Sequence, residues 1–462
     1  MSTDNPSSVD IQTETSPIPS VPAWFGEVAL LAHTMTRLGL LAEISEQVRF
    51  ARKRFGTFEV IDFVVMLIGY ALSGEPTLKA YYERVQPFAP AFMALFGRSQ
   101  LPHRATLSRF LAALDEPFVE ALRTVFLHDA LARLGPGANV GGLWDRQGTR
   151  WSVFDLDGTR QAARQRALPQ GPDLPPPQRR LSAVCAPGYT GRKRGEVVRT
   201  RTTLLQAHTH QWLFTSGGVG NGDDRGELLR GLSVIGAYQT ALGLLPTQAL
   251  VRLDGLYGNG TIVVDLSAAG VCFVMRGKDY GLLDLMQVKE RLALPADEQF
   301  THPESGTCRD LFDCGEVPVT AQGHRARLIG ATHQAASSPI GVTRDGMVSE
   351  LFFTALPAAG FTEALVVMLY VHRGSFETVL ADEDREQDSD RWSSYVRRFG
   401  IHEIALKEGR REKAKHLLRH LTYLEPKGKG ESSMSGKRLN KKVCIVTRRK
   451  SCPQEVSLRE RG

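Results

Sequence analysis

The chain has 462 residues, of which 42% are hydrophobic and 23% charged, with a formal net charge of +7 and a pI near 9.1. This is the composition of an ordinary globular protein, long enough for two or three domains. It excludes a membrane-embedded protein, because the longest apolar run is far shorter than the roughly 20 residues that span a bilayer. Six cysteines without a CxxC pair argue against a disulfide framework or a zinc site.

The two ends of the chain differ in composition from the rest. Residues 1–22 are polar and rich in Pro and Ser, which predicts a disordered N-terminus. Residues 404–462 hold 17 Lys/Arg against 6 Asp/Glu, so the positive charge of the chain lies in this segment. We expect residues 401–462 to form a basic tail, which is either solvated and disordered or a surface for a polyanion.

Residues 23–140 have the apolar spacing of helices. Apolar side chains recur every three and four residues in "WFGEVALLAHTMTRLGLLAEI" and "FVVMLIGYALSG". The stretch "LPHRATLSRFLAAL" (101–114) predicts a turn followed by an N-capped helix that carries Arg104 and Arg109. This helix is either half of a helix-turn-helix, with the two arginines as DNA contacts, or a plain helix of a bundle.

From residue 143 the pattern alternates as in strands. We expect a strand at 150–159, two strands joined by a turn at 195–220, a helix at 224–242, and then strand, helix and strand at 248–254, 260–270 and 271–277. This order predicts a mixed α/β sheet, with residues 141–280 as the first part of a core. Residues 281–355 predict a β-rich insertion, and residues 356–400 predict the C-terminal helix region of the core.

Two of the predicted strands end in aspartate followed by glycine, at Asp157 in "FDLDGT" and at Asp254 in "VRLDGLYG". The carboxyl ends of strands are where ligands and catalytic groups gather in open sheets. A pair of carboxylates there predicts a site for Mg²⁺, which prefers carboxylate oxygens. The alternative is that each aspartate only caps the turn that follows. Asp155 lies on the same face as Asp157 by strand alternation, so the identity of the first ligand stays open.

A third carboxylate follows in "LYVHRGSFETVLADED" (369–384). Tyr370, Arg373 and Glu377 are spaced i, i+3 and i+7, which places them on one face of a helix. A carboxylate for metal beside a guanidinium for phosphate suits a nuclease surface. An ordinary Arg–Glu surface pair has the same spacing.

These residues together resemble a known family. Tyr-x2-Arg-x3-Glu at Tyr370, Arg373 and Glu377, preceded by Asp157 in "DGT" and Asp254 in "LDGLYG", is similar to the motif set of the DDE-type insertion-sequence transposases of the YREK subgroup. The resemblance implies an α/β, RNase H-like mixed sheet with a β-rich insertion, preceded by an all-helical N-terminal domain. It implies that Asp157, Asp254 and Glu377 are catalytic and bind two Mg²⁺ ions, with Mn²⁺ able to substitute, while Tyr370 and Arg373 contact DNA.

The implied activity is metal-dependent DNA strand cleavage and strand transfer of an insertion sequence, that is, DNA transposition by recombination. The implied partners are DNA, as element ends and target, and a second copy of the chain, with no membrane and a cytoplasmic, nucleoid-associated location. One position departs from the motif: Asp384 stands where the family has a lysine, which passes that role to Arg385 or leaves it unfilled. Two alternatives remain, an inactive DNA-binding remnant and a metal-dependent nuclease without strand transfer.

Overall fold

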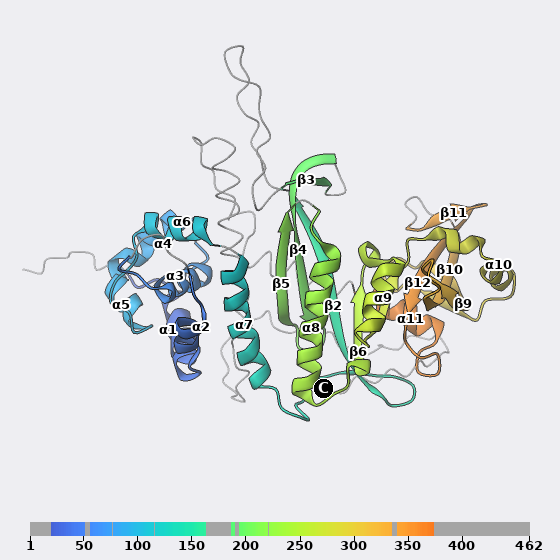
Figure 1. Cartoon of the computed structure of the whole chain (residues 1–462), viewed down its shortest axis with the longest axis horizontal. Helices are drawn as coiled ribbons and strands as arrows, with labels where there is room; N and C mark the ends of the chain where they lie inside the picture. Colours follow the sequence, from blue (N-terminus) through green and yellow to red (C-terminus); the bar gives the residue numbers. More distant parts are fainter. Residues whose placement is uncertain are drawn as a thin grey trace, which may run out of the picture.

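The computed structural model describes residues 20–50, 56–75, 77–114, 116–162, 186–189, 194–219, 221–334 and 340–373. The predictions for Glu377, Asp384 and Arg385, for nearly all of residues 1–22 and for the tail at 401–462 lie outside these ranges. At one end of the molecule lies a group of helices, blue in Figure 1. They are α1 (Phe25–Arg37), α2 (Leu40–Gln47), α3 (Val60–Leu72), α4 (Leu78–Val85), α5 (Ala89–Ala94) and α6 (Arg104–Ala113), followed by α7 (Glu116–Ala132), which leads to the sheet.

Helix α3 is the centre of this helical region because it is apolar on nearly every side. All residues from Ile61 to Tyr70 are buried, and the ring of Phe63 stacks on Phe110 of α6 at 4.3 Å between centroids. Helix α6 begins where the sequence predicts a capped helix. The side chain of His103 accepts a hydrogen bond from the backbone N–H of Ala105, which satisfies one of the free donors of the first turn.

A mixed sheet forms the middle of the molecule. Strand β2 (Arg150–Ala162) pairs antiparallel with β4 (Arg194–Gln206), and β4 pairs antiparallel with β5 (Gln211–Val219). On its other side β2 pairs in parallel with β6 (Ala249–Leu253), and β6 pairs in parallel with β7 (Cys272–Arg276). The helices α8 (Asp224–Leu242) and α9 (Gly260–Ala268) make the connections that this parallel pairing requires. Two short strands, β1 (Leu143–Trp144) and β3 (Ala186–Tyr189), add to β2 and β4.

The β-rich insertion continues the same sheet beyond β7, at the opposite end of the molecule from the helices (Figure 1). It begins with the helix α10 (Met286–Leu292), and its strands are β8 (Glu298–Thr301), β9 (Cys308–Pro318), β10 (Arg325–Gln334), β11 (Val342–Arg344) and β12 (Met347–Thr354). Strand β12 pairs antiparallel with β7, and the order continues through β10 and β9 to β8. The helix α11 (Glu363–Val371) follows β12.

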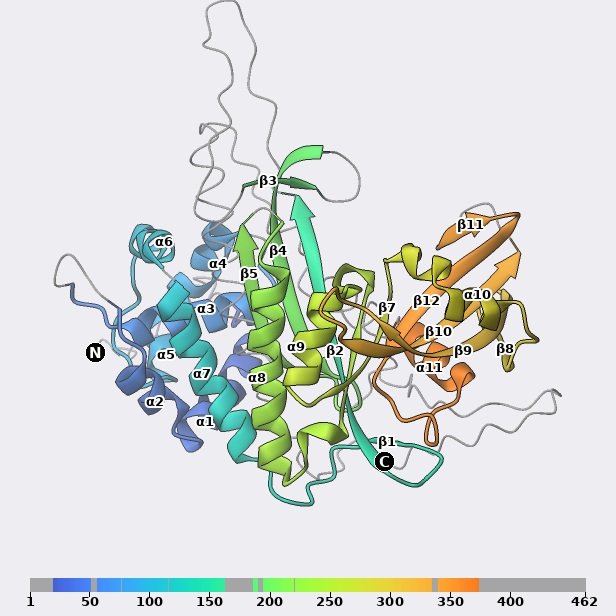
Figure 2. The same ribbon diagram turned by 45° about the vertical axis from the view of Figure 1, so that its right-hand side comes forward.

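Helices cover both faces of the sheet, and strand alternation supplies a core to each. Phe154 and Leu156 of β2 belong to the core under α8 and α9, whereas Trp151 and Val153 belong to the core under α11. Figure 2 shows α7, α8 and α9 together on one side of the sheet. Odd-numbered residues of β2 therefore face α11, which decides where its two aspartates point.

The fold class expected from the sequence is confirmed: an α/β protein with an RNase H-like mixed sheet and a β-rich insertion, preceded by helices. One expectation about β2 is wrong in detail. The strand does not end at Asp157 but runs on to Ala162, because β4 continues to pair with it after β6 has ended. None of the helices in the described part of the chain has the length and hydropathy needed to cross a bilayer.

Candidate active site

Asp157 and Asp254 lie side by side where β6 ends against β2. The last pair of the parallel ladder is Leu156 with Leu253, so the two aspartates are the next residue on each strand. Neighbouring strands are about 4.8 Å apart, and both side chains follow the alternation that faces α11. Two residues 97 positions apart in the sequence thus place carboxylates next to each other at the carboxyl end of β6.

Asp254 both caps the next turn and lies at this sheet edge. Its Oδ1 accepts a hydrogen bond of 2.8 Å from the N–H of Leu256, at the start of the 3-10 helix Gly255–Tyr257. The glycines that follow allow close backbone packing. A Cβ on Gly258 would lie 1.9 Å from the carbonyl oxygen of Arg276, and a Cβ on Gly260 would lie 1.9 Å from that of Val319. These glycines therefore make room for the protein's own backbone.

Arg373 meets Asp157 directly. Its Nη1 lies 3.2 Å from Oδ1 of Asp157, across 216 positions of sequence, and both side chains are largely buried. The other carboxylate oxygen, Oδ2, accepts a hydrogen bond of 3.0 Å from the hydroxyl of Thr159. The helix α11 ends at Val371, so Arg373 lies in the turn after it. The structure thus brings together the two aspartates and the arginine of the predicted motif.

Tyr370 lies one turn before Arg373 and is half-buried. Its ring packs edge-on against Phe352 of β12 at 5.1 Å between centroids. Burial raises the pKa of the Tyr370 hydroxyl, although the positive charges of Arg373 and Arg276 lower it. The tyrosine hydroxyl therefore keeps its proton and can donate a hydrogen bond.

The carboxylates of Asp157 and Asp254 repel each other, and a bound cation would offset this repulsion. Burial raises the pKa of Asp254, and repulsion from Asp157 raises it further, against the attraction of Arg373. For Arg373, burial lowers the pKa, but Asp157 and Asp254 outweigh burial and raise it above the usual value. The guanidinium contacts one of two half-buried carboxylates, so a divalent cation would stabilise the pair.

The donor set fits Mg²⁺ but is incomplete within the described residues. Asp157 and Asp254 offer the carboxylate oxygens that Mg²⁺ prefers. The part of the chain that the structure describes contains no group of three His, Cys, Asp or Glu side chains that could hold a metal. The third predicted ligand, Glu377, lies four residues beyond the last described residue.

Asp155, the other aspartate of β2, is engaged elsewhere. Both of its oxygens bind Arg252, at 2.7 Å from Nε and 2.7 Å from Nη2, and its side chain is 1% exposed. Arg252 is the neighbour of Asp155 in the parallel register. Asp157, and not Asp155, is therefore the aspartate of β2 that lies beside Asp254.

Several polar residues next to the site were missed by the sequence analysis. Lys278 follows the end of β7, is exposed, and lies close to Gly255 and to the charges of Asp254 and Asp224. The buried ring of Tyr257 reaches under β2, where its hydroxyl lies 3.1 Å from the Cβ position of Gly158. The sequence does contain a sign of Lys278, because this residue directly follows the predicted strand "VCFVMRG", at the same sheet edge as Asp254.

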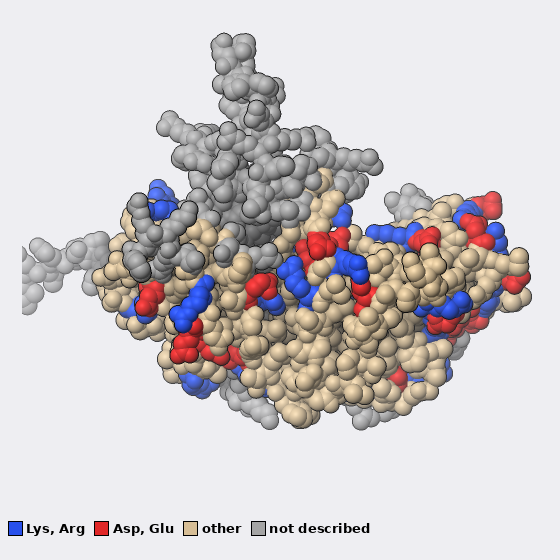
Figure 3. Space-filling model, viewed as in Figure 1, with Lys and Arg blue, Asp and Glu red and all other residues tan. Residues whose placement is uncertain are grey.

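Arg104 and Arg109 are exposed on α6 and lie apart from the carboxylates, at the helical end of the molecule (Figure 1). The Nε of Arg109 donates back to the carbonyl of Ala105 in its own helix. On the face shown in Figure 3, acidic and basic side chains gather around the start of α8, whereas the surface below them is mostly uncharged. The candidate DNA contacts therefore form two separate groups, one on the helical region and one at the sheet edge.

The sequence matches no protein family and no curated protein. Among solved structures, the chain is similar to a piggyBac transposase synaptic complex with hairpin DNA, seen by cryo-EM. The TM-score is 0.40 and the identity 10%, over 85% of this chain and 75% of that chain. These values are too low to carry an inference, so fold and function rest on the topology and side chains of the chain itself.

Proposed function

We propose that the protein is a transposase that cleaves DNA strands and joins them to a target with the help of Mg²⁺. The observation that supports this most is the placement of Asp157 and Asp254 on neighbouring parallel strands with Arg373 paired to the first of them. Such a carboxylate pair at a sheet edge is suited to metal-assisted phosphoryl transfer. Membership of the YREK transposases, action on an insertion sequence and the use of two ions are parts of the same proposal.

Each residue would have a separate task. Asp157, Asp254 and Glu377 would hold the metal ions. When bound, Mg²⁺ would activate water or a 3′-hydroxyl for attack and stabilise the leaving 3′-oxyanion. Arg373 and Tyr370 would contact the phosphate beside the carboxylates, and a guanidinium suits this because its planar fork matches phosphate oxygens.

Other contacts would place the rest of the DNA. Lys278 would approach a neighbouring phosphate from the end of β7, and Arg104 and Arg109 would bind the backbone of the element's ends. A second copy of the chain would hold the other end of the element. These contacts carry little sequence information, so recognition of the ends would come from base contacts elsewhere in the helical region.

The first test is cleavage of a linear duplex that carries the DNA flanking the coding sequence, with Mg²⁺, Mn²⁺ or EDTA. Asp157→Asn, Asp254→Asn and Glu377→Gln should each abolish cleavage, because the metal loses a ligand. Asp284→Asn is the matched control, since Asp284 is an exposed aspartate paired with Arg344 and Lys289 and with neither aspartate nor arginine of the site. Its cleavage should equal that of the unaltered protein.

The products distinguish the three functions. Joining of the cut ends to a second DNA supports a transposase, whereas cutting without joining indicates a metal-dependent nuclease. DNA binding without any Mg²⁺-dependent cutting would identify an inactive remnant and refute the catalytic proposal. Equal cutting by the unaltered protein and Asp254→Asn would refute the assignment of the carboxylates.

A further inference from the structure

The start of α11 is held by residues of the β-rich insertion. Thr362, the residue before the helix, makes no side-chain capping hydrogen bond with the described residues. The first N–H groups of a helix need partners from outside it. The N–H of Ala364 donates to Oε2 of Glu298, on the edge strand β8, at 2.8 Å. A carboxylate at this end also suits the helix dipole.

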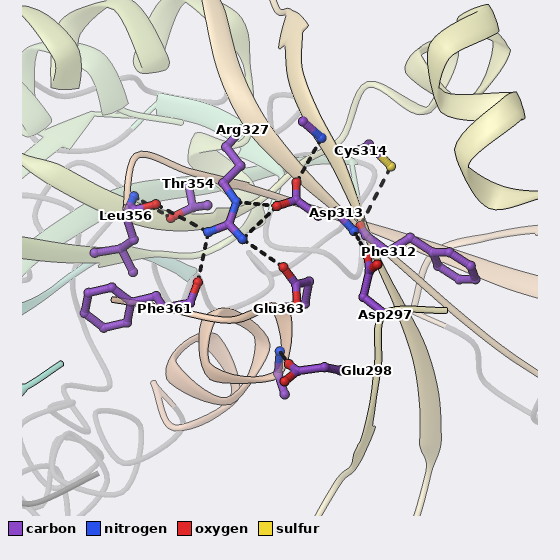
Figure 4. A network of polar contacts seen from close by, with 12 residues as sticks. Asp297, Glu298, Phe312, Asp313, Cys314, Arg327, Thr354, Leu356, Phe361 and Glu363 are labelled. Atoms are coloured by element: carbon purple, nitrogen blue, oxygen red, sulfur yellow. Dashed lines mark hydrogen bonds and ion pairs between the residues drawn. The ribbon is translucent and has the colours of Figure 1, made fainter. Parts of the chain in front are cut away.

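Arg327, on the insertion strand β10, binds the same helix start with its whole guanidinium group (Figure 4). Nε donates to Oδ2 of Asp313 at 2.9 Å, and Nη2 lies 2.8 Å from that oxygen and 2.9 Å from Oε1 of Glu363. Nη1 donates to the carbonyls of Phe361 at 3.0 Å and Leu356 at 3.4 Å. The side chain is 8% exposed, so these bonds are shielded from water.

A second buried arginine holds the other end of α11. Nη1 of Arg252 donates to the carbonyl of Leu369 at 3.3 Å, while its other nitrogens bind Asp155. Leu369 is in the last turn of the helix, where carbonyls lack partners within the helix. The helix is therefore fixed at its end by the core and at its start by the insertion.

We propose that Arg327 is a positioning residue of the active site: it fixes the start of α11 so that Arg373, in the turn after the helix, reaches Asp157. This inference rests on the proposed function, because it gives the insertion a task in DNA cleavage. Glu363 and Tyr370 are seven residues apart, about 10 Å along a helix, so a tilt at the start moves the far end. A misplacement of about 1 Å can lower a catalytic rate 100-fold.

The fork of the guanidinium is what makes Arg327 suited to this task. Its donors point in fixed directions in one plane, so a single side chain reaches a carboxylate on β9, a carboxylate on α11 and two loop carbonyls. A lysine keeps the charge but is a single point donor. Arg327→Lys is therefore the informative variant, since it preserves the net charge of the cluster and removes the geometry.

The experiment compares Arg327→Lys with Arg344→Lys. Arg344 is the matched control, because it lies in the same insertion and its hydrogen bonds go to Asp284 and the carbonyl of Tyr280, neither of which belongs to α11. Two measurements are made well below the unfolding temperature: hydrogen exchange of the amides of residues 363–371, and kcat and KM for Mg²⁺-dependent cleavage of the flanking duplex. Arg327→Lys should speed exchange in α11 about tenfold and lower kcat about 10- to 100-fold, with KM unchanged. Arg344→Lys should change neither.

Each of the other possible outcomes contradicts one part of the proposal. Unchanged exchange in Arg327→Lys would show that Arg327 does not anchor the helix, whatever the activity. Faster exchange with an unchanged kcat would show that Arg327 anchors α11 but does not position the active site. An unaltered protein that cuts no duplex would refute the proposed function and the positioning role with it, while the exchange data would still report on the anchor.

Discussion

Asp155 and Arg252 form a buried ion pair across two neighbouring parallel strands, two residues before the positions of Asp157 and Asp254. The two layers of charged residues differ in environment. In the first layer the charges match, with two hydrogen bonds of 2.7 Å between them. In the second layer two carboxylates lie together with Arg373 bound to one of them. The inner layer is paired within the sheet, and the outer layer is where we propose that the metal binds.

The two aspartates of β2 should therefore respond differently to loss of charge. Asp155→Asn leaves the guanidinium of Arg252 buried without its counter-ion, which we expect to cost about 3–5 kcal/mol of unfolding free energy. Asp157→Asn removes a repulsion with Asp254 along with its contact to Arg373, and because these two effects offset each other we expect a smaller loss of about 1 kcal/mol. Urea unfolding followed by circular dichroism measures both. Equal losses in the two variants would contradict the assignment of separate roles.

The sequence predicts more of the sheet than of the site. Alternation suffices to place Asp157 on the face of β2 that meets α11, the strand end places Asp254, and apolar spacing places α8, because these features depend on local spacing. The mixed sheet also follows from the expected order of strands and helices. The length of β2 does not, because its last residues are strand only through their pairing with β4.

The contacts that complete the site depend on distant parts of the chain. Nothing in the local sequence shows that Asp155 meets Arg252, since the register of β2 against β6 decides it. The same holds for the contact of Arg327 with Glu363, which needs the insertion to fold back against α11. Sequence spacing identifies residues that share a face of a strand or helix. Only the packed sheet shows which of these residues are paired with another side chain.

The glycines after Asp254 give a second prediction. Gly258→Ala places a Cβ 1.9 Å from the carbonyl oxygen of Arg276, so the backbone of one loop must move. We expect a loss of about 2 kcal/mol or more in unfolding free energy. Gly255→Ala is the control, because its Cβ would be in ordinary contact with side-chain atoms of Lys278 at 3.5 Å and Arg276 at 3.9 Å. The control should be neutral or slightly stabilising. A Gly258→Ala protein as stable as Gly255→Ala would show that the two loops are not packed as described.

Arg373 gives a third prediction. Arg373→Gln removes the only charge that contacts Asp157 among the described ion pairs, and it removes the group proposed to contact phosphate. We expect kcat for Mg²⁺-dependent cleavage to fall about 100-fold, with a smaller loss for Arg373→Lys. The control is Arg225→Gln, which breaks an arginine–aspartate pair with Asp265 at the start of α8. Equal activity of Arg373→Gln and Arg225→Gln would exclude a role for Arg373 in the reaction.

A fourth prediction concerns pH. The folded protein holds the proton of Asp254 more tightly than the unfolded chain, because burial and the charge of Asp157 raise its pKa. Below the usual carboxyl pKa the group is protonated in both states and contributes nothing. As pH rises from there through the raised value, the unfolded chain loses this proton first, so the stability of the fold declines. Asp224 and Glu227 also have raised pKa values through burial, so only a comparison with a variant isolates Asp254.

Asp254→Asn is that variant, and its amide oxygen can still accept the hydrogen bond from Leu256. In EDTA we expect it to be more stable than the unaltered protein at pH 7 but not at pH 3, since the cost of the buried charge exists only at the higher pH. Mg²⁺ should reverse the order at pH 7, because binding at 100 times Kd adds about 2.7 kcal/mol to the unaltered protein alone. Urea unfolding at both pH values, with and without Mg²⁺, measures this. A constant difference in stability between the two proteins at both pH values, unaffected by Mg²⁺, would contradict the prediction. It would mean that the charge of Asp254 does not destabilise the fold and that Asp254 does not bind the metal.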